Sequence, residues 1–276
     1  QRQMCIRDSY MTDRVKVSIE DHVAVVTLNR PEKHNALDAE MFAALADSGQ
    51  RLAGDRSVRA VVLEGSGVNF CTGLDTSIFA AGDAVINAAA LAPMEGSLAN
   101  RFQRAAYVWR EVPVPVICAI SGIAYGGGLQ LALGADIRYA RADSRLSIME
   151  IKWGIMPDMA ITTTLCRCMS ADRIKELALT GRVIDGTEAF QLGLVTAVHE
   201  DPSAAARDTA AEIAGKSPDA IRAIKRLFDT AWHLPDADAL RLEAQLQLTL
   251  LGGHNQVEAV MSNIEGRAPD FADPEG

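Results

Sequence analysis

The sequence predicts an α/β protein whose last third is helical. Strand patterns rich in β-branched residues, such as 59–64 and 116–120, alternate with helical patterns, which is typical of parallel sheets covered by helices. After residue 160 the strand pattern nearly ends and amphipathic helical stretches follow. The 276 residues, 49% of them hydrophobic, suffice for one or two domains with a sizeable core.

The expected elements follow from these periodicities. The strand patterns fall at 15–20, 22–29, 59–64, 116–120, 136–140, 146–148 and 194–198. The helical patterns fall at 38–53, 98–110, 129–133, 218–231, 237–251 and 256–264, and Asp38 is a predicted N-cap. Residues 1–10 show neither periodicity and predict an added or disordered tail. We therefore divide the chain into this tail, a core over 11–200 and a helical region over 201–276.

The charge of the chain narrows the classes of possible partner, and its cysteine content indicates the compartment. With 27 basic and 36 acidic side chains the formal charge is −9, which disfavours nucleic acid and anionic membranes as partners. No run reaches the roughly 18 to 20 apolar residues of a membrane-spanning helix, and the start of the chain has no signal-peptide pattern. The five cysteines are sparse and odd in number, which indicates a reduced compartment, so we expect a cytoplasmic protein. Cys166 and Cys168 are interpreted as packing residues, because no histidine pair completes a metal site.

Two glycine-containing turns offer free backbone N–H groups. Leu74 follows Cys71-Thr-Gly73 after a strand, and Gly127 lies in a triple glycine at the start of a helix. Two such donors form an oxyanion hole when they converge on one carbonyl oxygen. The alternative is that glycines simply serve strand-to-helix turns, where they are common. Neither turn has the pattern of a dinucleotide or P-loop site, so nicotinamide and ATP are not expected.

Several segments together carry a family resemblance. They are LNRPEKHNAL at 28–37, GSGVNFCTGLD at 65–75, VICAISGIAYGGG at 116–128, the Ala-Asp pair at 135–136 and GIMP at 154–157. In this order they resemble the crotonase family, the enoyl-CoA hydratase/isomerase superfamily, and the tail at 265–271 resembles that family's final CoA-contacting helix. The resemblance runs from about residue 14 to 271. It implies a spiral of ββα units with a helical C-terminal trimerisation region, assembled as a homotrimer or a dimer of trimers. It also implies acyl-CoA thioester substrates, with no metal and no cofactor besides the CoA of the substrate.

The resemblance also assigns binding roles. It places the oxyanion donors on the N–H groups of Leu74 and Gly127. The residues that it implies for CoA binding are Lys33, Asn35, Ala36, Leu37, Thr72 and Asp75. Lys33 matches a phosphate by charge, and a solvated surface lysine is the alternative. Asp75 is also expected to cap the following helix.

The carboxylates decide which reaction such a site performs. A thioester carbonyl held by two N–H donors has an acidic α-proton, and a carboxylate can move that proton. By the resemblance, hydratases use two glutamates; the first position here is Gln130, which cannot exchange a proton, and the second is Glu150, the predicted base. Asp158 lies where some dienoyl-CoA isomerases of the family also carry an acidic residue. The alternatives are a surface carboxylate for Glu150 and a helix N-cap for Asp158.

The predicted function is therefore double-bond isomerisation of an acyl-CoA through a thioester enolate, with Glu150 as base and Asp158 as its partner in a proton shuttle. Gln130 would orient substrate or water. The first alternative is an enoyl-CoA hydratase in which Gln130 positions the water that Glu150 activates. The second is an acyl-CoA-binding protein with little turnover.

Overall fold

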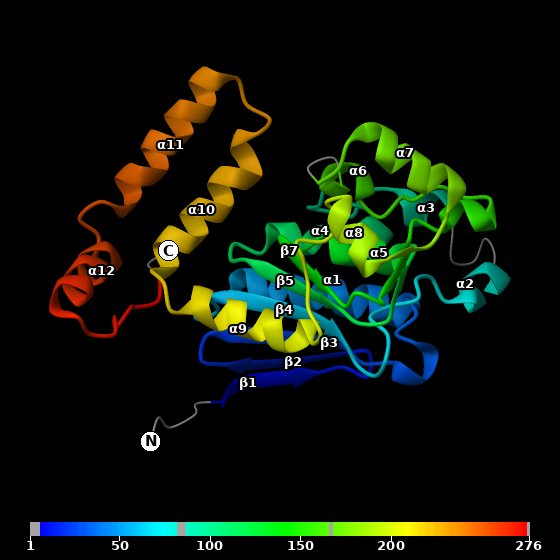
Figure 1. Ribbon diagram of the computed structural model, residues 1–276, viewed down its shortest axis with the longest axis horizontal. Helices are drawn as coiled ribbons and strands as arrows, with labels where there is room; N and C mark the ends of the chain where they lie inside the picture. Colours follow the sequence, from blue (N-terminus) through cyan, green and yellow to red (C-terminus); the bar gives the residue numbers. More distant parts are fainter. Residues whose placement is uncertain (1–5, 82–86, 166–167, 275–276) are drawn as a thin grey trace.

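The computed structural model describes residues 6–81, 87–165 and 168–274, which form a mixed α/β fold with two sheets (Figure 1). The larger sheet contains, in spatial order, β1 (Ile6–Met11), β2 (Val15–Glu20), β3 (Val23–Leu28), β4 (Ala60–Gly65), β5 (Val116–Ile120), β7 (Ile137–Ala140) and β10 (Ala197–Val198). The smaller sheet contains β6 (Ile123–Tyr125), β8 (Arg145–Ser147) and β9 (Ile184–Asp185). The predicted α/β class is confirmed.

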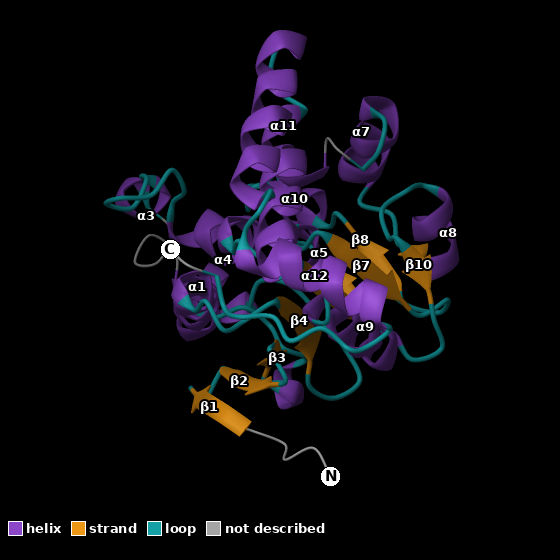
Figure 2. Cartoon of the chain, turned by 90° about the vertical axis from the view of Figure 1, so that its left-hand side faces the viewer, coloured by secondary structure: helices purple, strands orange, loops and turns teal. Residues whose placement is uncertain are grey.

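The first strand corrects the expectation for the N-terminus. Strand β1 pairs antiparallel with β2 at the edge of the larger sheet, with an irregularity between Arg7 and Tyr10 (Figure 2). The disordered reading of the tail over 1–10 is therefore wrong from Ile6 onward, the reading of an added segment stays a prediction, and residues 1–5 lie outside the described ranges. The physical reason is that an open edge strand offers backbone N–H and C=O groups, so pairing with it requires no alternating side-chain pattern.

The remaining sheet connections confirm the expected hairpin and the buried strands. Strands β2 and β3 pair antiparallel through the turn at Asp21, whereas β3, β4, β5 and β7 are parallel neighbours. Strand β4 is buried on both faces because Val61 and Leu63 belong to the main core, while Ala60 and Val62 pack on the opposite face with α9 (Pro202–Ala214). An isolated parallel bridge between Cys71 and Ala124 brings the loop after β4 beside β6 of the smaller sheet.

Helices of 3 to 16 residues connect these strands. In the described ranges they are η1 (Pro31–Lys33), α1 (Ala39–Gly54), α2 (Thr76–Ala81), α3 (Ala88–Leu91), α4 (Arg101–Glu111), α5 (Gly127–Leu133), η3 (Glu150–Trp153), α6 (Ile161–Thr164), α7 (Ala171–Thr180) and α8 (Gly186–Gln191). The Asp38 side chain accepts a hydrogen bond from the Met41 N–H, which confirms the predicted N-cap of α1. Helices α1 and α4 cover the main-core face of the larger sheet.

The C-terminal helices project from this body. They are α10 (Pro218–Ala231), α11 (Asp236–Leu250) and α12 (His254–Glu265), and the first two form a long antiparallel pair (Figure 1). The bounds of α10 match the prediction because Ser217 caps its first turn and Pro218 occupies the first helical position. Many apolar side chains of this region are exposed: Ile224, Phe228, Trp232, Leu240, Leu248, Leu251 and Ile264.

Two remaining predictions concern the cysteines and membrane-spanning helices. Cys71, Cys118 and Cys168 are free thiols; Cys168 packs against the core as predicted, whereas Cys166 lies outside the described residues. In the part of the chain that the structure describes, no helix has both the length and the apolar character needed to cross a bilayer. The cytoplasmic location inferred from the cysteine content stays a prediction.

Candidate active site

A cavity of about 350 Å³ opens where the loops after β3, β4 and β6 meet the turn around η3. Seven of the predicted site residues line it: Lys33, Ala36, Thr72, Leu74, Asp75, Gly127 and Glu150. Four do not line it: Asn35, Leu37, Gln130 and Asp158. The structure thus brings the predicted oxyanion donors and the predicted base to one cavity.

The peptide that joins Gly73 to Leu74 directs the Leu74 N–H group away from Leu37. Leu37 and Leu74 form an isolated parallel bridge, in which the Leu37 N–H donates to Gly73 O at 2.8 Å. Because a trans peptide directs its C=O and N–H in opposite directions, the Leu74 N–H points away from Leu37. This N–H has no acceptor among the described residues, and Leu74 lines the cavity. It is therefore available to a ligand.

The second donor follows from a helix start. Gly126 O accepts the Gln130 N–H at 3.0 Å, so the Gly127 N–H of the same peptide points out of the N-terminus of α5. The Gly127 N–H likewise has no acceptor within the described ranges. A helix N-terminus also favours negative charge. The turns that carry the Leu74 and Gly127 N–H groups lie close together. A Cβ added to Gly73 would lie only 2.6 Å from Tyr125 O and 3.5 Å from Gly127 N.

Each residue of the triple glycine is a glycine for a separate reason. Gly126 has φ 51° and ψ −123°, a conformation that side chains rarely permit. A Cβ on Gly127 would lie 2.8 Å from Met159 Sδ, and a Cβ on Gly128 would lie 2.4 Å from Cys71 O. The glycines therefore permit both the turn and the close approach of α5 to the loop after β4, which a solely turn-forming role would not require.

Glu150 is the one predicted acid or base that lines the cavity, and it is buried, with an exposed fraction of 7%. Its Oε1 accepts a hydrogen bond from Gln130 Nε2 at 2.5 Å, whereas its buried Oε2 has no partner among the described residues. Burial and, to a smaller extent, the charge of Asp158 raise the pKa of Glu150. The surface alternative for Glu150 is wrong. One oxygen of a buried carboxylate is left free to take a proton.

Gln130 is held entirely by protein groups. Its exposed fraction is 1%, its Nε2 donates to Glu150, and its Oε1 accepts the Met159 N–H at 2.8 Å. These two bonds fix the orientation of the amide, because the backbone N–H is a donor and the carboxylate an acceptor. The side chain thus orients Glu150 directly.

Asp158 is half-buried between Glu150 and α6. Burial raises the pKa of Asp158, and the charge of Asp158 in turn raises the pKa of Glu150. The alternative role as a helix N-cap is wrong, since α6 begins after Ala160, which has φ 63°, and no side chain caps it. The left-handed residue separates Asp158 from the first turn of the helix.

The residues predicted to bind CoA form an outer and an inner layer. Lys33, Ala36 and Thr72 line the cavity, whereas Asn35 and Leu37 are fully buried beneath it. The Asn35 amide donates to Ser66 O and Asn69 O and accepts the Arg30 N–H, so it holds the loop together and does not reach the cavity. Asp75 accepts the Ser77 N–H, which confirms its predicted capping role at α2.

Other cavity residues were not predicted individually. They are Glu32, His34, Tyr125, Met149, Trp153 and Ile155. Asn69 Oδ1 accepts the Ile123 N–H, so its Nδ2 donates to His34 Nδ1, and the imidazole carries its proton on Nε2. The only sequence signal for these residues was their position beside the predicted ones.

The C-terminal tail does not form the expected CoA-contacting helix within this chain. Helix α12 ends at Gly266, and the following residues are extended. Phe271 O accepts a hydrogen bond from Arg59 Nη2 at 2.8 Å. Arg59 precedes the first residue of β4, whereas the cavity lies beyond the last, so the tail and the cavity are at opposite ends of the strand.

The described residues contain no group of three or more His, Cys, Asp or Glu side chains arranged to hold a metal ion. Cys71 is adjacent to the cavity but buried, and burial raises the pKa of its thiol to about 12, which makes it a poor nucleophile. The chemistry of the site therefore rests on two N–H donors and a carboxyl pair.

Comparison with known proteins gives the family. The model of the enoyl-CoA hydratase/isomerase family matches residues 18–274. The chain is 30% identical over 257 residues to an enoyl-CoA hydratase of Mycobacterium tuberculosis, covering 91% of this chain and 93% of the relative. It is 32% identical over 261 residues to the mitochondrial Delta(3,5)-Delta(2,4)-dienoyl-CoA isomerase of Mus musculus, covering 91% of this chain and 79% of the relative.

A solved structure agrees. The crystal structure of an enoyl-CoA hydratase from Mycobacterium tuberculosis H37Rv superposes with a TM-score of 0.83 at 28% identity, covering 95% of this chain and 100% of that one. The sequence motifs, the paired N–H donors, the fold and the family match all agree. The chain is an enzyme that belongs to the enoyl-CoA hydratase/isomerase family, the crotonase superfamily.

Proposed function

We propose that this enzyme isomerises the double bond of a 3-enoyl-CoA or 3,5-dienoyl-CoA thioester, with Glu150 as the base. The observation that carries the proposal is that Glu150 lines the cavity that also holds the Leu74 and Gly127 donors, and that its buried Oε2 has no hydrogen-bond partner among the described residues. The first test is whether the purified chain converts a 3-enoyl-CoA into the conjugated 2-enoyl-CoA, followed by ultraviolet absorbance.

The proposed steps use only groups of this chain. The thioester oxygen accepts the Leu74 and Gly127 N–H groups, and Glu150 Oε2 removes a proton from C2 to give an enolate. Protonated Asp158 then delivers a proton to C4 of a 3-enoyl or C6 of a 3,5-dienoyl chain, and the double bonds shift toward the carbonyl. The proton on Glu150 then passes to Asp158, which restores the starting state of the enzyme. No atoms are gained or lost, so the reaction requires no cofactor beyond the CoA of the substrate.

The carboxyl pair favours isomerisation over hydration. Burial raises the pKa of both carboxyl groups, and the charge of Asp158 raises that of Glu150 further, so the pair can supply one base and one acid. The mouse relative named as a dienoyl-CoA isomerase supports this assignment.

The second candidate is enoyl-CoA hydration, which the names of other relatives favour. In that reaction Gln130 would position the water that Glu150 activates. Against it, both ends of the Gln130 amide are bonded to protein groups, the Nε2 to Glu150 Oε1 and the Oε1 to the Met159 N–H. A water beside Glu150 would therefore lack a second carboxylate.

Changing Asp158 to Asn tests the acid role through pH dependence. In the active form Glu150 is ionised and Asp158 is protonated, so a neutral amide at position 158 leaves the acid limb of kcat in place and removes the alkaline limb, which reports loss of the Asp158 proton. The rate with 3,5-dienoyl-CoA should fall by about 100-fold, and that with 3-enoyl-CoA by about tenfold, because Glu150 alone reaches C4 more readily than C6. Stopped assays across the pH range measure both. An alkaline limb that persists, or equal losses on both substrates, would argue against the shuttle.

We also propose that CoA binds over the outer layer of the 30–37 loop, with Lys33 as a phosphate partner.

We further propose that the enzyme is a homotrimer or a dimer of trimers. Ile224, Phe228 and Trp232 on the projecting α10 are between 51% and 69% exposed, and they border a hollow of about 660 Å³. Sedimentation analysis should give three or six times the chain mass of 29.6 kDa, and a monomer at micromolar concentration would contradict the assembly.

A further inference from the structure

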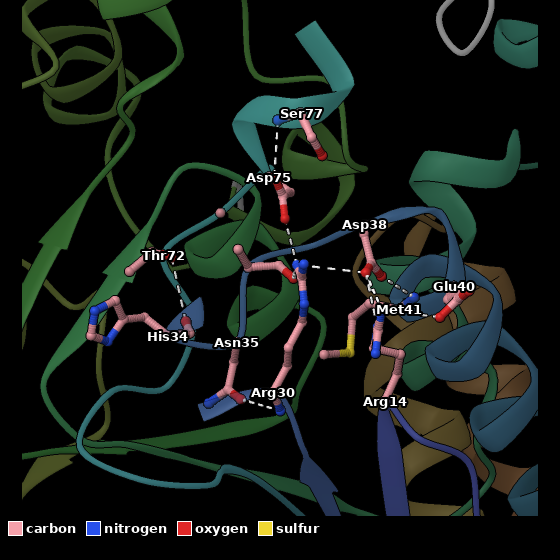
Figure 3. Close-up of polar contacts among 12 residues, drawn as sticks. Arg14, Arg30, His34, Asn35, Asp38, Glu40, Met41, Thr72, Asp75 and Ser77 are labelled. Carbon is pink, nitrogen blue, oxygen red and sulfur yellow. Dashed lines mark hydrogen bonds and ion pairs between the residues drawn. The ribbon is translucent and has the colours of Figure 1, made fainter. Parts of the chain in front are cut away.

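Arg30 is a nearly buried cation beneath the cavity. Its side chain is 13% exposed, and its Nη1 lies 2.5 Å from Asp75 Oδ2, 3.1 Å from Ala36 O and 3.5 Å from Asp38 Oδ2 (Figure 3). Arg30 is not among the residues that line the cavity. It joins the loop after β3, the turn after β4 and the start of α1.

Two of these contacts flank the bridge that orients the Leu74 peptide. Ala36 precedes Leu37, and Asp75 follows Leu74. The Asp75 N–H also donates to Leu37 O at 2.9 Å. Arg30 therefore bonds to both segments of the bridge, one residue away from the bridge residue on each.

Asp75 is shared between Arg30 and α2. Its Oδ1 accepts the Ser77 N–H at 2.9 Å, while its Oδ2 bonds to Arg30. The Ser77 N–H first, and then the Arg30 guanidinium, lower the pKa of Asp75 to about 2, so the pair is ionised at neutral pH. A charge-assisted bond at this low exposure restrains the backbone at Leu74 more than a surface ion pair would.

We propose that Arg30 is a positioning residue that sets the direction of the Leu74 N–H and so preorganises the oxyanion hole. The inference rests on the proposed function in one respect, that this N–H binds the thioester carbonyl. Arg30 acts in two ways. Its bonds to Ala36 and Asp75 hold the two segments of the bridge in register, and its charge neutralises the Asp75 carboxylate, which would otherwise repel a developing oxyanion one residue away.

Arg30→Gln is the primary test, with Arg14→Gln as the matched control. Arg14 also pairs with Asp38, at 2.8 Å, and with Glu40, but within the described ranges its side chain bonds to neither Asp75 nor Ala36. Arg30→Gln should lower kcat by about 30-fold, less than the 10²- to 10³-fold loss typical of a deleted oxyanion donor, with little change in KM. Arg14→Gln should leave kcat unchanged.

The conservative variant separates positioning from packing. The three acceptors all contact one nitrogen of Arg30, so the single ammonium of Arg30→Lys can meet part of this set. We expect it to recover most of the lost kcat. If Arg30→Gln does not fold, Asp75→Asn takes its place as the test. It keeps an acceptor for the Ser77 N–H, and it should also lower kcat. The double variant should be no worse than Arg30→Gln alone.

A spectroscopic readout reports the oxyanion hole without turnover. A saturated acyl-CoA with a ¹³C-labelled thioester carbonyl is bound to the unmodified enzyme and to each variant, and the carbonyl stretch is measured by infrared difference spectroscopy. Binding to the unmodified enzyme should lower the stretching frequency, and Arg30→Gln should reduce that shift to about half. Arg30→Lys and Arg14→Gln should retain most or all of it.

The outcomes separate the two proposals. If isomerase activity is absent but the carbonyl shift is present and falls in Arg30→Gln, the positioning role stands and the proposed reaction fails. If activity is present and Arg30→Gln changes stability alone, with kcat and the carbonyl shift intact, the positioning role is overturned. An equal loss in Arg14→Gln, or no carbonyl shift in the unmodified enzyme, would also overturn it.

Discussion

Replacing Glu150 with glutamine is expected to reduce isomerisation by about 10³-fold, within the range that a lost general base costs, while the affinity for an acyl-CoA changes little. The glutamine can keep its oxygen toward Gln130 Nε2, so the buried contact and the fold are retained. Its NH₂ group then stands where the free Oε2 was, and an amide cannot accept the C2 proton. Initial rates and a binding isotherm with a saturated acyl-CoA measure the two quantities.

Glu212→Gln is the matched control for this substitution. Glu212 lies on α9 with 74% of its side chain exposed, and it pairs with the exposed Lys216. The same chemical change there should leave activity intact. Retention of most activity by Glu150→Gln would remove Glu150 from the mechanism.

Replacing Gln130 with glutamate should change the reaction. The new carboxylate would stand about 2.5 Å from Glu150 Oε1, a distance at which two carboxyl groups must share a proton. One oxygen can still accept the Met159 N–H, so the fold should tolerate the change. We expect hydration of 2-enoyl-CoA to rise by at least about tenfold, because the proton shared with Glu150 lets the pair supply both a base for water and an acid for C2, and isomerisation to fall by about tenfold.

Gln130→Met controls for the loss of the amide. It removes the bond to Glu150 without adding a carboxyl group, so isomerisation should fall with no gain of hydration. The products are separated by chromatography. If Gln130→Glu gains no hydration, Gln130 is not what limits that reaction, and the choice between the two candidate functions must rest elsewhere.

Much of the site was predictable because its parts carry local signals. Glycines and a strand end place the Leu74 and Gly127 turns, and the bounds of α10 follow from a serine cap before a proline. The family resemblance then assigns Glu150 as a base, and the fold brings it to the same cavity. These features depend on short stretches of sequence, which is why they are legible there.

Other features depend on contacts between distant segments and have no local pattern. The strand over Ile6–Met11 forms because β2 leaves an open edge. Asp158 has the residue type of a helix cap, yet the left-handed Ala160 separates it from α6. The orientation of the Gln130 amide depends on Glu150 and the Met159 N–H, both 20 or more residues away in the sequence. Such arrangements follow only from the folded structure.

The central claim is that the enzyme moves a double bond without adding water. Its most direct test is mass spectrometry of the products formed from 3-enoyl-CoA and from 2-enoyl-CoA of matched length, in D₂O and in H₂¹⁸O. We predict a conjugated product of unchanged composition from the 3-enoyl substrate, with deuterium incorporated from D₂O and no ¹⁸O. A 3-hydroxyacyl product carrying ¹⁸O from the 2-enoyl substrate, without bond migration in the 3-enoyl substrate, would contradict the claim and identify the enzyme as a hydratase.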